Sequence, residues 1–441
     1  MSRPSTALLT DRYELTMLDA ALHDGTAARP CVFEVFARRL PPGRRYGVVA
    51  GVDRVVESLE HFHFDDDVVR WLEAERIVTA STLRWLANFR FRGDVHAYRE
   101  GEVYVDGSPI MTVVAPFGDA LLMETLVLSI LNHDSAIAAA GARMVSAADG
   151  RRLLEFGSRR THEDAAVAAA RAAVLVGFDA TSNLEAGRRH GIPTAGTTGH
   201  AFILVHDDER SAFAAQVATT GAATTLLVDT YDTTTGIATA LDVAGPTLGA
   251  VRIDSGDLTE MARRARTALD ASGATETRIV VSGDLDEFAI SDLADAPVDA
   301  YGVGTALVTG SGAPTAGFVY KLVARATTPG GELVPVAKGG GAKATVGRWK
   351  VAARERSDGI ATRELLRPAG TPRPEGSRAL QIPVMTSGEQ VTNNDLAQAR
   401  AHHRAAMDEL PAEAHRLDAG DPVLPTVHLV ETDSTAASRQ R

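Results

Sequence analysis

The stretch GAVRIDSGDL at residues 249–258 decides the fold class. It begins as a short apolar run, turns polar at Arg252 and Asp254, and leads into a helical pattern that Asp257 can cap. Gly273 is placed to end that helix, because glycine adopts the left-handed conformation that often follows a last helical turn. A strand, a polar loop and a helix therefore follow one another in this part of the chain.

Similar units recur along the middle of the sequence. Other short apolar runs that end in small or acidic residues lie at residues 153–160, 173–183, 225–233, 277–287 and 299–305. Strands that alternate with helices favour a parallel sheet, and the number of units is sufficient for an α/β barrel. Outside this region, residues 13–22 have helical spacing, residues 94–116 resemble a small antiparallel meander, and residues 120–148 predict one or two buried helices.

Composition restricts the class of function. The chain has 441 residues and a formal net charge of −12, which disfavours a nucleic-acid binder because such proteins neutralise phosphates with a basic surface. No apolar run is long enough for a transmembrane helix, and the N-terminus lacks the apolar segment of a signal peptide. Cys31 is the single cysteine, so an internal disulfide is impossible and we expect a cytoplasmic protein.

Polar residues at the predicted strand ends are the first candidates for a site. Arg252 and Asp254 point to the same face of their strand, where they either grip a small polar substrate or form a structural ion pair. The GVGT sequence at residues 302–305 is either a phosphate loop, with backbone N–H groups and the Thr305 hydroxyl as donors, or an ordinary tight turn.

Two further motifs carry residues with suitable chemistry. His200 ends the sequence GTTGH, where small neighbours leave an imidazole free to act as a base or to accept a phosphoryl group. Phe156 and Arg159 in FGSRRTH would suit an aromatic carboxylate through stacking and a guanidinium contact. The alternatives are a structural histidine and a core phenylalanine beside surface arginines. The sequence contains no CxxC pair, HExxH, Walker or GxSxG motif.

Taken together, the motifs resemble one known family. TDRYELTM, FGSRR, FDATSN, GTTGHAF, LLVDTYDT, VRIDSGDL and YGVGT occur in the order and spacing of the nicotinate phosphoribosyltransferases, from about residue 8 to about residue 350. The resemblance implies the α/β barrel of the type II phosphoribosyltransferases, joined to an α+β sandwich built from both chain ends. The domains it predicts are an N-terminal part at 1–145, the barrel at 146–335, a C-terminal part at 336–430 and a disordered tail at 431–441.

The resemblance also implies a reaction. Nicotinate would attack C1 of phosphoribosyl pyrophosphate, giving nicotinate mononucleotide and pyrophosphate, with coupled ATP hydrolysis and Mg²⁺ carried on the phosphates. This is the first step of NAD salvage from nicotinate. His200 matches the histidine that ATP phosphorylates. A homodimer with shared active sites is implied, because Tyr13 matches a tyrosine that reaches the nicotinate ring from the neighbouring subunit.

The other site residues follow from the same resemblance. Phe156 matches the ring on the other face of nicotinate, and Thr197 matches a nicotinate contact. Arg159 and Arg252 match the cationic grip on the carboxylate and the sugar phosphates. The residues expected on the ribose and its 5′-phosphate are Asp254, Ser255, Gly302, Gly304 and Thr305.

Four alternatives remain at this stage. The related nicotinamide enzymes carry an aspartate where this chain has Ser182 or Asn183, and the absence of that charge favours a carboxylate substrate. Quinolinate enzymes should need more cations for a second carboxylate. A non-catalytic ligand sensor is disfavoured because no candidate position is apolar, and an aldolase-type barrel enzyme is disfavoured because no lysine lies at the strand ends.

Overall fold

The computed structural model describes residues 5–339, 349–393 and 395–429. It divides into two compact units. The central unit comprises Ile137–Pro314 and His415–Leu417, and the N/C unit comprises Met1–Ala136, Thr315–Ala414 and Asp418–Arg441. The predicted tail at 431–441 lies outside the described residues.

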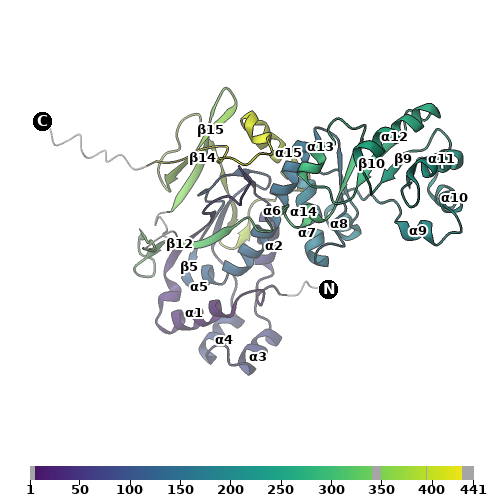
Figure 1. Cartoon of the computed structure of the whole chain (residues 1–441). Helices are drawn as coiled ribbons and strands as arrows, with labels where there is room; N and C mark the ends of the chain where they lie inside the picture. Colours follow the sequence, from purple (N-terminus) through teal and green to yellow (C-terminus); the bar gives the residue numbers. More distant parts are fainter. Residues whose placement is uncertain (1–4, 340–348, 394, 430–441) are drawn as a thin grey trace. The chain divides into compact units, whose positions relative to one another are not determined.

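The central unit is built on a parallel sheet of six strands (Figure 1). In spatial order the strands are β7 (Ala180–Thr181), β6 (Arg152–Glu155), β11 (Ala300–Val303), β10 (Arg278–Ser282), β9 (Ala250–Ile253) and β8 (Thr225–Leu227). Every neighbouring pair is parallel, which confirms the α/β class. The sheet is a half-barrel, because β7 and β8 remain as edges within the described part of the chain.

Helices follow the strands of this unit, as the alternating pattern predicts. They are α7 (Glu163–Val176), α8 (Leu184–His190), α9 (His200–Leu204), α10 (Glu209–Thr220), α11 (Thr233–Ala244), α12 (Leu258–Ala271), α13 (Glu287–Asp292) and α14 (Thr305–Val308). The prediction for α12 is confirmed in detail. Asp257 accepts a hydrogen bond from the Glu260 amide at 3.1 Å, and Gly273 has a positive φ of 76° just after the helix.

One predicted strand is wrong. The apolar run that opens residues 173–183 forms the end of α7, and only Ala180–Thr181 is a strand. A short buried helix end and a buried strand have the same apolar pattern, so periodicity alone does not separate them. The helix ends at Gly177, which has a φ of 131° that other residues rarely adopt.

The N/C unit contains the other sheets. Its largest sheet has the order β13 (Leu333–Pro335), β12 (Phe318–Ala326), β1 (Pro30–Ala37), β5 (Met111–Pro116), β3 (Asp94–Tyr98), β17 (Gln381–Thr386) and β18 (Glu389–Gln390). A four-stranded sheet has the order β16 (Arg378–Ala379), β14 (Lys350–Ser357), β15 (Ile360–Pro368) and β19 (Thr426–His428). A third sheet pairs β2 (Gly47–Val48) with β4 (Val103–Tyr104). The expected meander therefore differs in one respect, because β3 pairs with β5 while β4 pairs with β2.

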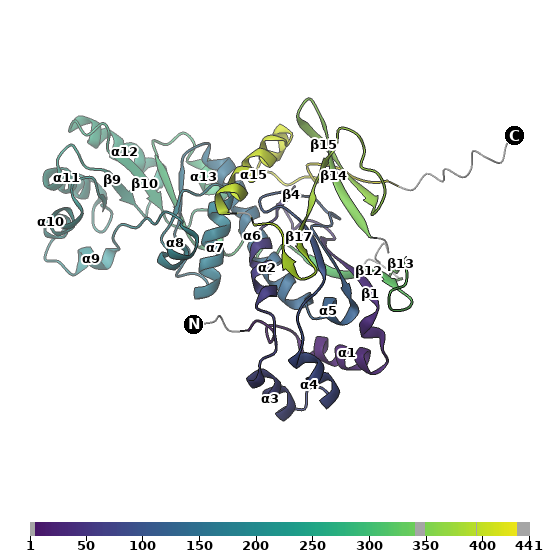
Figure 2. The same cartoon turned by 180° about the vertical axis from the view of Figure 1, so that it is seen from behind.

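The helices of this unit are seen in Figure 2. They are α1 (Arg12–His23), α2 (Val52–Glu60), α3 (Asp66–Ala74), α4 (Ala80–Ala87), α5 (Phe117–Leu121) and α15 (Leu396–Asp408). The short 3-10 turns are Thr26–Ala28 and Ala412–His415. The helix predicted at 13–22 is confirmed as α1, and the helical region at 120–148 contains the end of α5 and all of α6 (Glu124–Ala148).

The division between the units falls earlier than the sequence suggests. The predicted boundaries are 145/146 and 335/336, whereas the units divide within α6 after Ala136 and again before Thr315. The second difference has a clear reason. Strand β12 pairs along β1 from Cys31 to Ala37, so it belongs to the N/C unit.

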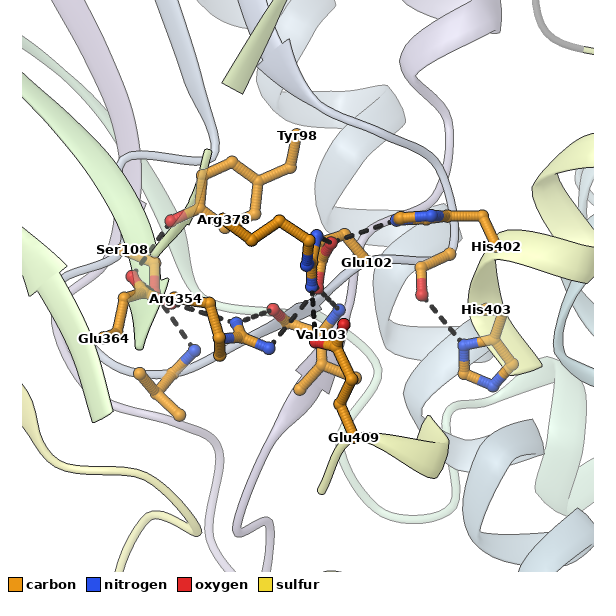
Figure 3. Close-up of polar contacts among 12 residues, drawn as sticks. Tyr98, Glu102, Val103, Ser108, Arg354, Glu364, Arg378, His402, His403 and Glu409 are labelled. Atoms are coloured by element: carbon orange, nitrogen blue, oxygen red, sulfur yellow. Dashed lines mark hydrogen bonds and ion pairs between the residues drawn. The ribbon is translucent and has the colours of Figure 1, made fainter. Parts of the chain in front are cut away.

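A buried ion network joins the sheets of the N/C unit (Figure 3). Arg354 on β14 is fully buried, with Nη1 at 3.4 Å from Glu102 Oε1 and Nη2 at 3.2 Å from Glu364 Oε2. Glu102 Oε2 also accepts a hydrogen bond from Arg378 Nη1 at 2.6 Å and lies 3.0 Å from His402 Nε2. Burial alone would raise the pKa of Glu102, but these partners hold it well below its usual range.

Glu364 completes this network from the other side. Its Oε1 accepts hydrogen bonds from Tyr98 Oη at 2.9 Å and Ser108 Oγ at 2.6 Å. Tyr98 is on β3 and Glu364 on β15, so the network connects two sheets through side chains that are 0–1% exposed. Such a network is expected to hold the sheets in one arrangement.

Two single features complete the description. Cys31 is buried on β1, and burial raises the pKa of its thiol to about 11, which fits the expectation of a packing residue. None of the helices in the described ranges combines the length and apolar character that crossing a membrane requires.

Candidate active site

A cavity of about 360 Å³ opens at the carboxyl ends of the strands in the central unit. Its lining residues are Phe156, Ser158, Arg159, Ser182, Gly196, Thr197, Thr198, Gly199, His200, Leu227, Arg252 and Asp254. They come from the loops after β6, β7 and β9, from the GTTGH segment, and from Leu227 and Arg252 on β8 and β9 themselves. The structure thus brings together most of the predicted site residues at the end of the sheet where α/β proteins bind ligands.

Arg252 lines the cavity, and each of its three guanidinium nitrogens donates a hydrogen bond. Its Nε donates to Ser282 Oγ at 2.8 Å, Nη1 to Thr197 Oγ1 at 3.2 Å, and Nη2 to Asp254 Oδ1 at 2.7 Å. The guanidinium carbon also lies 5.5 Å from the centre of the Phe156 ring, within reach of a cation–π contact. The position of this charge is therefore fixed before any ligand arrives.

Asp254 uses only one of its carboxylate oxygens in these contacts. Both Arg252 and Ser282 donate to Oδ1, whereas Oδ2 accepts no hydrogen bond from the described residues. Burial raises the pKa of Asp254, but the hydrogen bonds from Ser282 and Arg252 outweigh it and lower the pKa below its ordinary value. Asp254 is therefore ionised at neutral pH and presents one open oxygen.

Asp229 connects Asp254 to the histidine. Its Oδ2 accepts from the Asp254 amide at 2.8 Å and from Ser255 Oγ at 2.7 Å, while Oδ1 lies 3.1 Å from His200 Nε2. The Asp229 side chain is 2% exposed and that of His200 is 40% exposed. A buried carboxylate therefore orients an imidazole whose other edge is accessible.

Phe156 forms the aromatic wall of the cavity, and a glycine makes room for it. A side chain at Gly302 would place its Cβ 2.6 Å from the Phe156 ring, so only glycine is compatible with this ring position. Arg159 also lines the cavity and is exposed. No hydrogen bond or ion pair joins Arg159 to the described residues. In this respect Arg159 differs from Arg252, whose guanidinium donates to Ser282, Thr197 and Asp254.

Buried Glu155 fixes the two loops on this side. It accepts hydrogen bonds from the Gly157 amide and from Thr181 Oγ1, at the starts of the loops that follow β6 and β7. In the second of these loops Ser182 lines the cavity, whereas Asn183 caps α8 by accepting from the Ala186 amide at 2.9 Å. Ser182 is therefore the residue that faces a ligand.

Five predicted residues lie outside this lining. Ser255 donates a hydrogen bond to Asp229 Oδ2, and Gly302 lies against the Phe156 ring. Thr305 is exposed at the start of α14, and Gly304 precedes that helix as its N-cap. Tyr13 is on α1 of the N/C unit, with 44% of its surface exposed. Burial and the nearby Glu124 raise the pKa of Tyr13 to about 12, so it is a neutral phenol at physiological pH. The phosphate role of GVGT and the ring contact of Tyr13 remain predictions.

Sequence reasoning missed Asp229 and Ser282 as parts of the site. Both occur just where a strand ends, Asp229 two residues after β8 and Ser282 as the last residue of β10. The same strand-end rule that selected Asp254 would have selected them. Behind the first cavity, a second of about 240 Å³ lies against Ala250, Val280 and Ala300 of the sheet, and Phe156 and Arg252 line both.

Comparison with known proteins agrees with this geometry. Residues 8–132 match the model of the nicotinate phosphoribosyltransferase N-terminal domain. The chain is 55% identical over 430 residues to a nicotinate phosphoribosyltransferase of Mycobacterium tuberculosis, covering 95% of this chain and 94% of the relative. The chain belongs to the nicotinate phosphoribosyltransferase family. A Bacillus subtilis member is 40% identical over 73% of this chain and 67% of its own length.

Solved structures agree with the family assignment. Human nicotinic acid phosphoribosyltransferase superimposes with a TM-score of 0.81 at 26% identity, covering 96% of this chain and 97% of the human chain. A nicotinate-nucleotide pyrophosphorylase from Pyrococcus furiosus shares the fold with a TM-score of 0.76 at 24% identity, over 92% of this chain and 95% of its own. The nicotinate phosphoribosyltransferase family and its fold are thus confirmed.

Proposed function

We propose that this protein is a nicotinate phosphoribosyltransferase that forms nicotinate mononucleotide and pyrophosphate from nicotinate and phosphoribosyl pyrophosphate, with coupled ATP hydrolysis. The observation that carries the proposal is the cavity in which Arg252 and Asp254 are fixed beside Phe156, Arg159 and His200. The membership of the nicotinate phosphoribosyltransferase family supports the choice of substrate, and the product would enter NAD salvage.

Nicotinate would bind between the aromatic wall and the free arginine. The Phe156 ring offers a face for the pyridine, and Arg159 has a guanidinium whose donors are not used by the described residues. Arg252 is already engaged by Ser282, Thr197 and Asp254. We therefore assign the primary carboxylate grip to Arg159, and to Arg252 a fixed positive charge beneath the reacting groups.

Ribosyl transfer needs positioning and charge stabilisation more than a protein nucleophile. As the C1–O bond of phosphoribosyl pyrophosphate breaks, positive charge develops on the ribose and negative charge on pyrophosphate. The open Oδ2 of Asp254 is suited to a ribose hydroxyl or to Mg²⁺ that arrives on the phosphates, since hard cations prefer carboxylate oxygens. Bound Mg²⁺ would neutralise charge on the leaving pyrophosphate.

His200 would serve the coupling to ATP. Asp229 orients the imidazole through Nε2, and Nδ1 has no hydrogen-bond partner among the described residues. Nδ1 could accept the γ-phosphoryl group, with ADP as the leaving group and inorganic phosphate released when water later cleaves the phosphohistidine. A phosphohistidine at the cavity would add charge beside the site of phosphoribosyl pyrophosphate and alter its affinity.

The first test is a direct assay. Purified protein with nicotinate, phosphoribosyl pyrophosphate, Mg²⁺ and ATP should form nicotinate mononucleotide, as detected by chromatography. Exclusive conversion of nicotinamide or quinolinate would transfer the assignment to a relative. Tight binding of nicotinate without turnover would instead support a ligand sensor.

His200→Asn should abolish ATP hydrolysis and raise the KM for phosphoribosyl pyrophosphate, while some slow transfer survives. The physical reason is that asparagine can keep a hydrogen bond to Asp229 but cannot accept a phosphoryl group. His206→Asn is the matched control, because His206 follows the same short helix, its ring Nδ1 bonds the Phe202 carbonyl, and it does not line the cavity. Loss of all transfer at saturating substrate would contradict the coupling role.

Ser182→Asp tests substrate choice. A carboxylate at this position in the cavity should repel nicotinate and raise its KM at least about tenfold, since like charges at close range cost more than 1 kcal/mol. The relative rate with nicotinamide should rise. Ser182→Asn is the neutral control of similar size, and equal KM values for the two variants would refute the electrostatic explanation.

Three further statements remain proposals. A homodimer would allow Tyr13 of the partner subunit to complete the site, which is compatible with its exposed position on α1. Sedimentation analysis tests the dimer, and mixed dimers of Tyr13→Ala with His200→Asn chains test the sharing of sites. A cytoplasmic location remains our prediction from the sequence.

A further inference from the structure

A second pocket, of about 450 Å³, lies in the N/C unit and plays no part in the proposed reaction. It opens over one face of the four-stranded sheet, beside β3. Trp349, just before β14, and Val351 on β14 line the pocket, whereas Lys350 between them does not line it and pairs with Glu34 at 2.5 Å. The volume falls in the range of small-molecule sites.

Two polar side chains at this pocket have buried atoms that nothing satisfies. Arg367 Nε and His96 Nδ1 are both buried and have no hydrogen-bond partner among the described residues. Buried donors without acceptors are uncommon and costly, so each such atom calls for a ligand or an ordered solvent molecule. Here two of them line the same pocket.

The charge of the pocket selects an anion. Arg367 is anchored by a hydrogen bond from Nη1 to the Thr371 carbonyl, and no ion pair joins it to the described residues. Burial and the nearby Arg373 lower the pKa of Arg367, which reflects positive charge that is not compensated. None of the lining residues is acidic, and Asp94, whose charge acts on His96, accepts from the Ser387 amide at 2.8 Å.

The remaining lining restricts the shape of that anion. Trp349 provides an aromatic face, and Val351, Ala352, Ala369 and Ala379 provide apolar contacts. Gln381 cannot select a ligand, because its amide group is used by Pro109, Thr112 and Ala352. A flat ring that carries one negative group satisfies both parts of the pocket.

We propose that this pocket is a second binding site, for a small aromatic carboxylate. The carboxylate accepts hydrogen bonds from Arg367 Nε and from His96 Nδ1, and the ring packs against Trp349. All residues that line the site belong to the N/C unit.

The test uses the full chain labelled with 5-fluorotryptophan and titrated with benzoate. The chain has three tryptophans, Trp71, Trp85 and Trp349, so fluorine NMR should show three resonances that single Trp→Phe variants assign. Benzoate should shift the Trp349 resonance and leave the other two unchanged. Because the cavity of the central unit has no tryptophan in its lining, binding there does not produce this result.

Neutral benzamide should bind at least about tenfold more weakly than benzoate, because hydrogen bonds to a charged group are stronger than those to a neutral one. Arg367→Gln should weaken benzoate binding by a similar factor. Arg373→Gln, which removes a nearby exposed charge that does not line the pocket, is the matched control and should change the affinity less than about threefold.

Several results would overturn the proposal. They are an unshifted Trp349 resonance up to about 10 mM benzoate, equal affinity for benzamide, and equal losses in the two arginine variants. If Arg367→Gln lowers the melting temperature, Arg367→Lys replaces it, since lysine keeps the charge but cannot supply the Nε donor. Unchanged benzoate affinity in that variant counts against the assigned contact.

Discussion

Two arginines in this chain form ion pairs with carboxylates, Arg354 with Glu102 and Glu364 in the N/C unit and Arg252 with Asp254 in the central unit. Arg354 is fully buried, and the two carboxylates it contacts, Glu102 and Glu364, are 0–1% exposed with hydrogen bonds at each oxygen (Figure 3). Arg252 and Asp254 have side chains 12% and 26% exposed, and Asp254 keeps one oxygen open.

The difference teaches how a structural ion cluster is distinguished from a functional one. The sequence around Arg252 allowed either interpretation, and residue types alone did not decide between them. The two clusters differ in where their polar atoms without a hydrogen-bond partner lie. In the N/C unit every carboxylate oxygen of the network has a partner and Arg354 Nε, which has none among the described residues, is buried, whereas in the central unit Asp254 Oδ2, the Arg159 guanidinium and one edge of His200 face a cavity. We therefore expect substitutions to affect stability in the first cluster and turnover in the second.

The largest effect is expected for Arg354→Met. This change leaves Glu102 and Glu364 buried without their shared partner and should destabilise the protein by about 3–5 kcal/mol, as measured by chemical unfolding. The activity of the molecules that remain folded should be unchanged. The matched control is Arg356→Met on the same strand, whose 3.0 Å pair with Glu409 is partly exposed and should contribute less than about 1 kcal/mol.

Arg252→Lys should show the reverse pattern. Lysine cannot reproduce the three-sided contact with Ser282, Thr197 and Asp254, so kcat/KM for nicotinate should fall by about 10²–10³-fold. The melting temperature should change little. Arg263→Lys on the exposed face of α12 is the control and should be neutral. A large loss of stability with normal turnover would place Arg252 in the same class as Arg354.

The smallest effect concerns Glu209 at the start of α10. It is 8% exposed, and its Oε1 has no hydrogen-bond partner among the described residues. Burial, and then Asp229 and Asp232, raise the pKa of Glu209 from 4.5 to about 7. The folded protein therefore binds this proton more tightly than the unfolded chain, and the stability it gives is present below pH 4.5 and lost as the pH rises through about 7.

Glu209→Gln should remove this pH dependence. Its stability relative to the parent should increase from about pH 4.5 upward and level off above about pH 7, at no more than about 3 kcal/mol. Calorimetry at a series of pH values measures the difference. Glu260→Gln, at a partly exposed position on α12, is the control. A constant difference between the two proteins at every pH would show that Glu209 does not titrate in this range.

The fold was predictable where local chemistry repeats. Strand β9, its polar end and α12 follow directly from residues 249–273, and the recurrence of such units predicts a parallel sheet. The apolar run at 173–176 was misassigned because a buried helix and a buried strand share that pattern. The placement of β12 beside β1 depends on pairing between segments far apart in the chain, which no local pattern encodes.

The site was predictable in its members but not in its contacts. Arg252, Asp254, His200, Phe156, Arg159 and Thr197 were named from the sequence and line one cavity. The link through Asp229 was missed, since it depends on the spatial order of β8 and β9. The difference between an engaged Arg252 and a free Arg159 also requires coordinates.

The single buried cysteine has a practical consequence for labelling. A thiol reacts as its thiolate, and burial that raises the pKa of Cys31 to about 11 leaves almost none of it in that form at neutral pH. A cysteine introduced at an exposed position would therefore be the dominant reactive group on the chain. Met17→Cys, at an exposed position on α1 that has no role in the proposed site, would carry a fluorophore or spin label, so that distances between two copies could be measured.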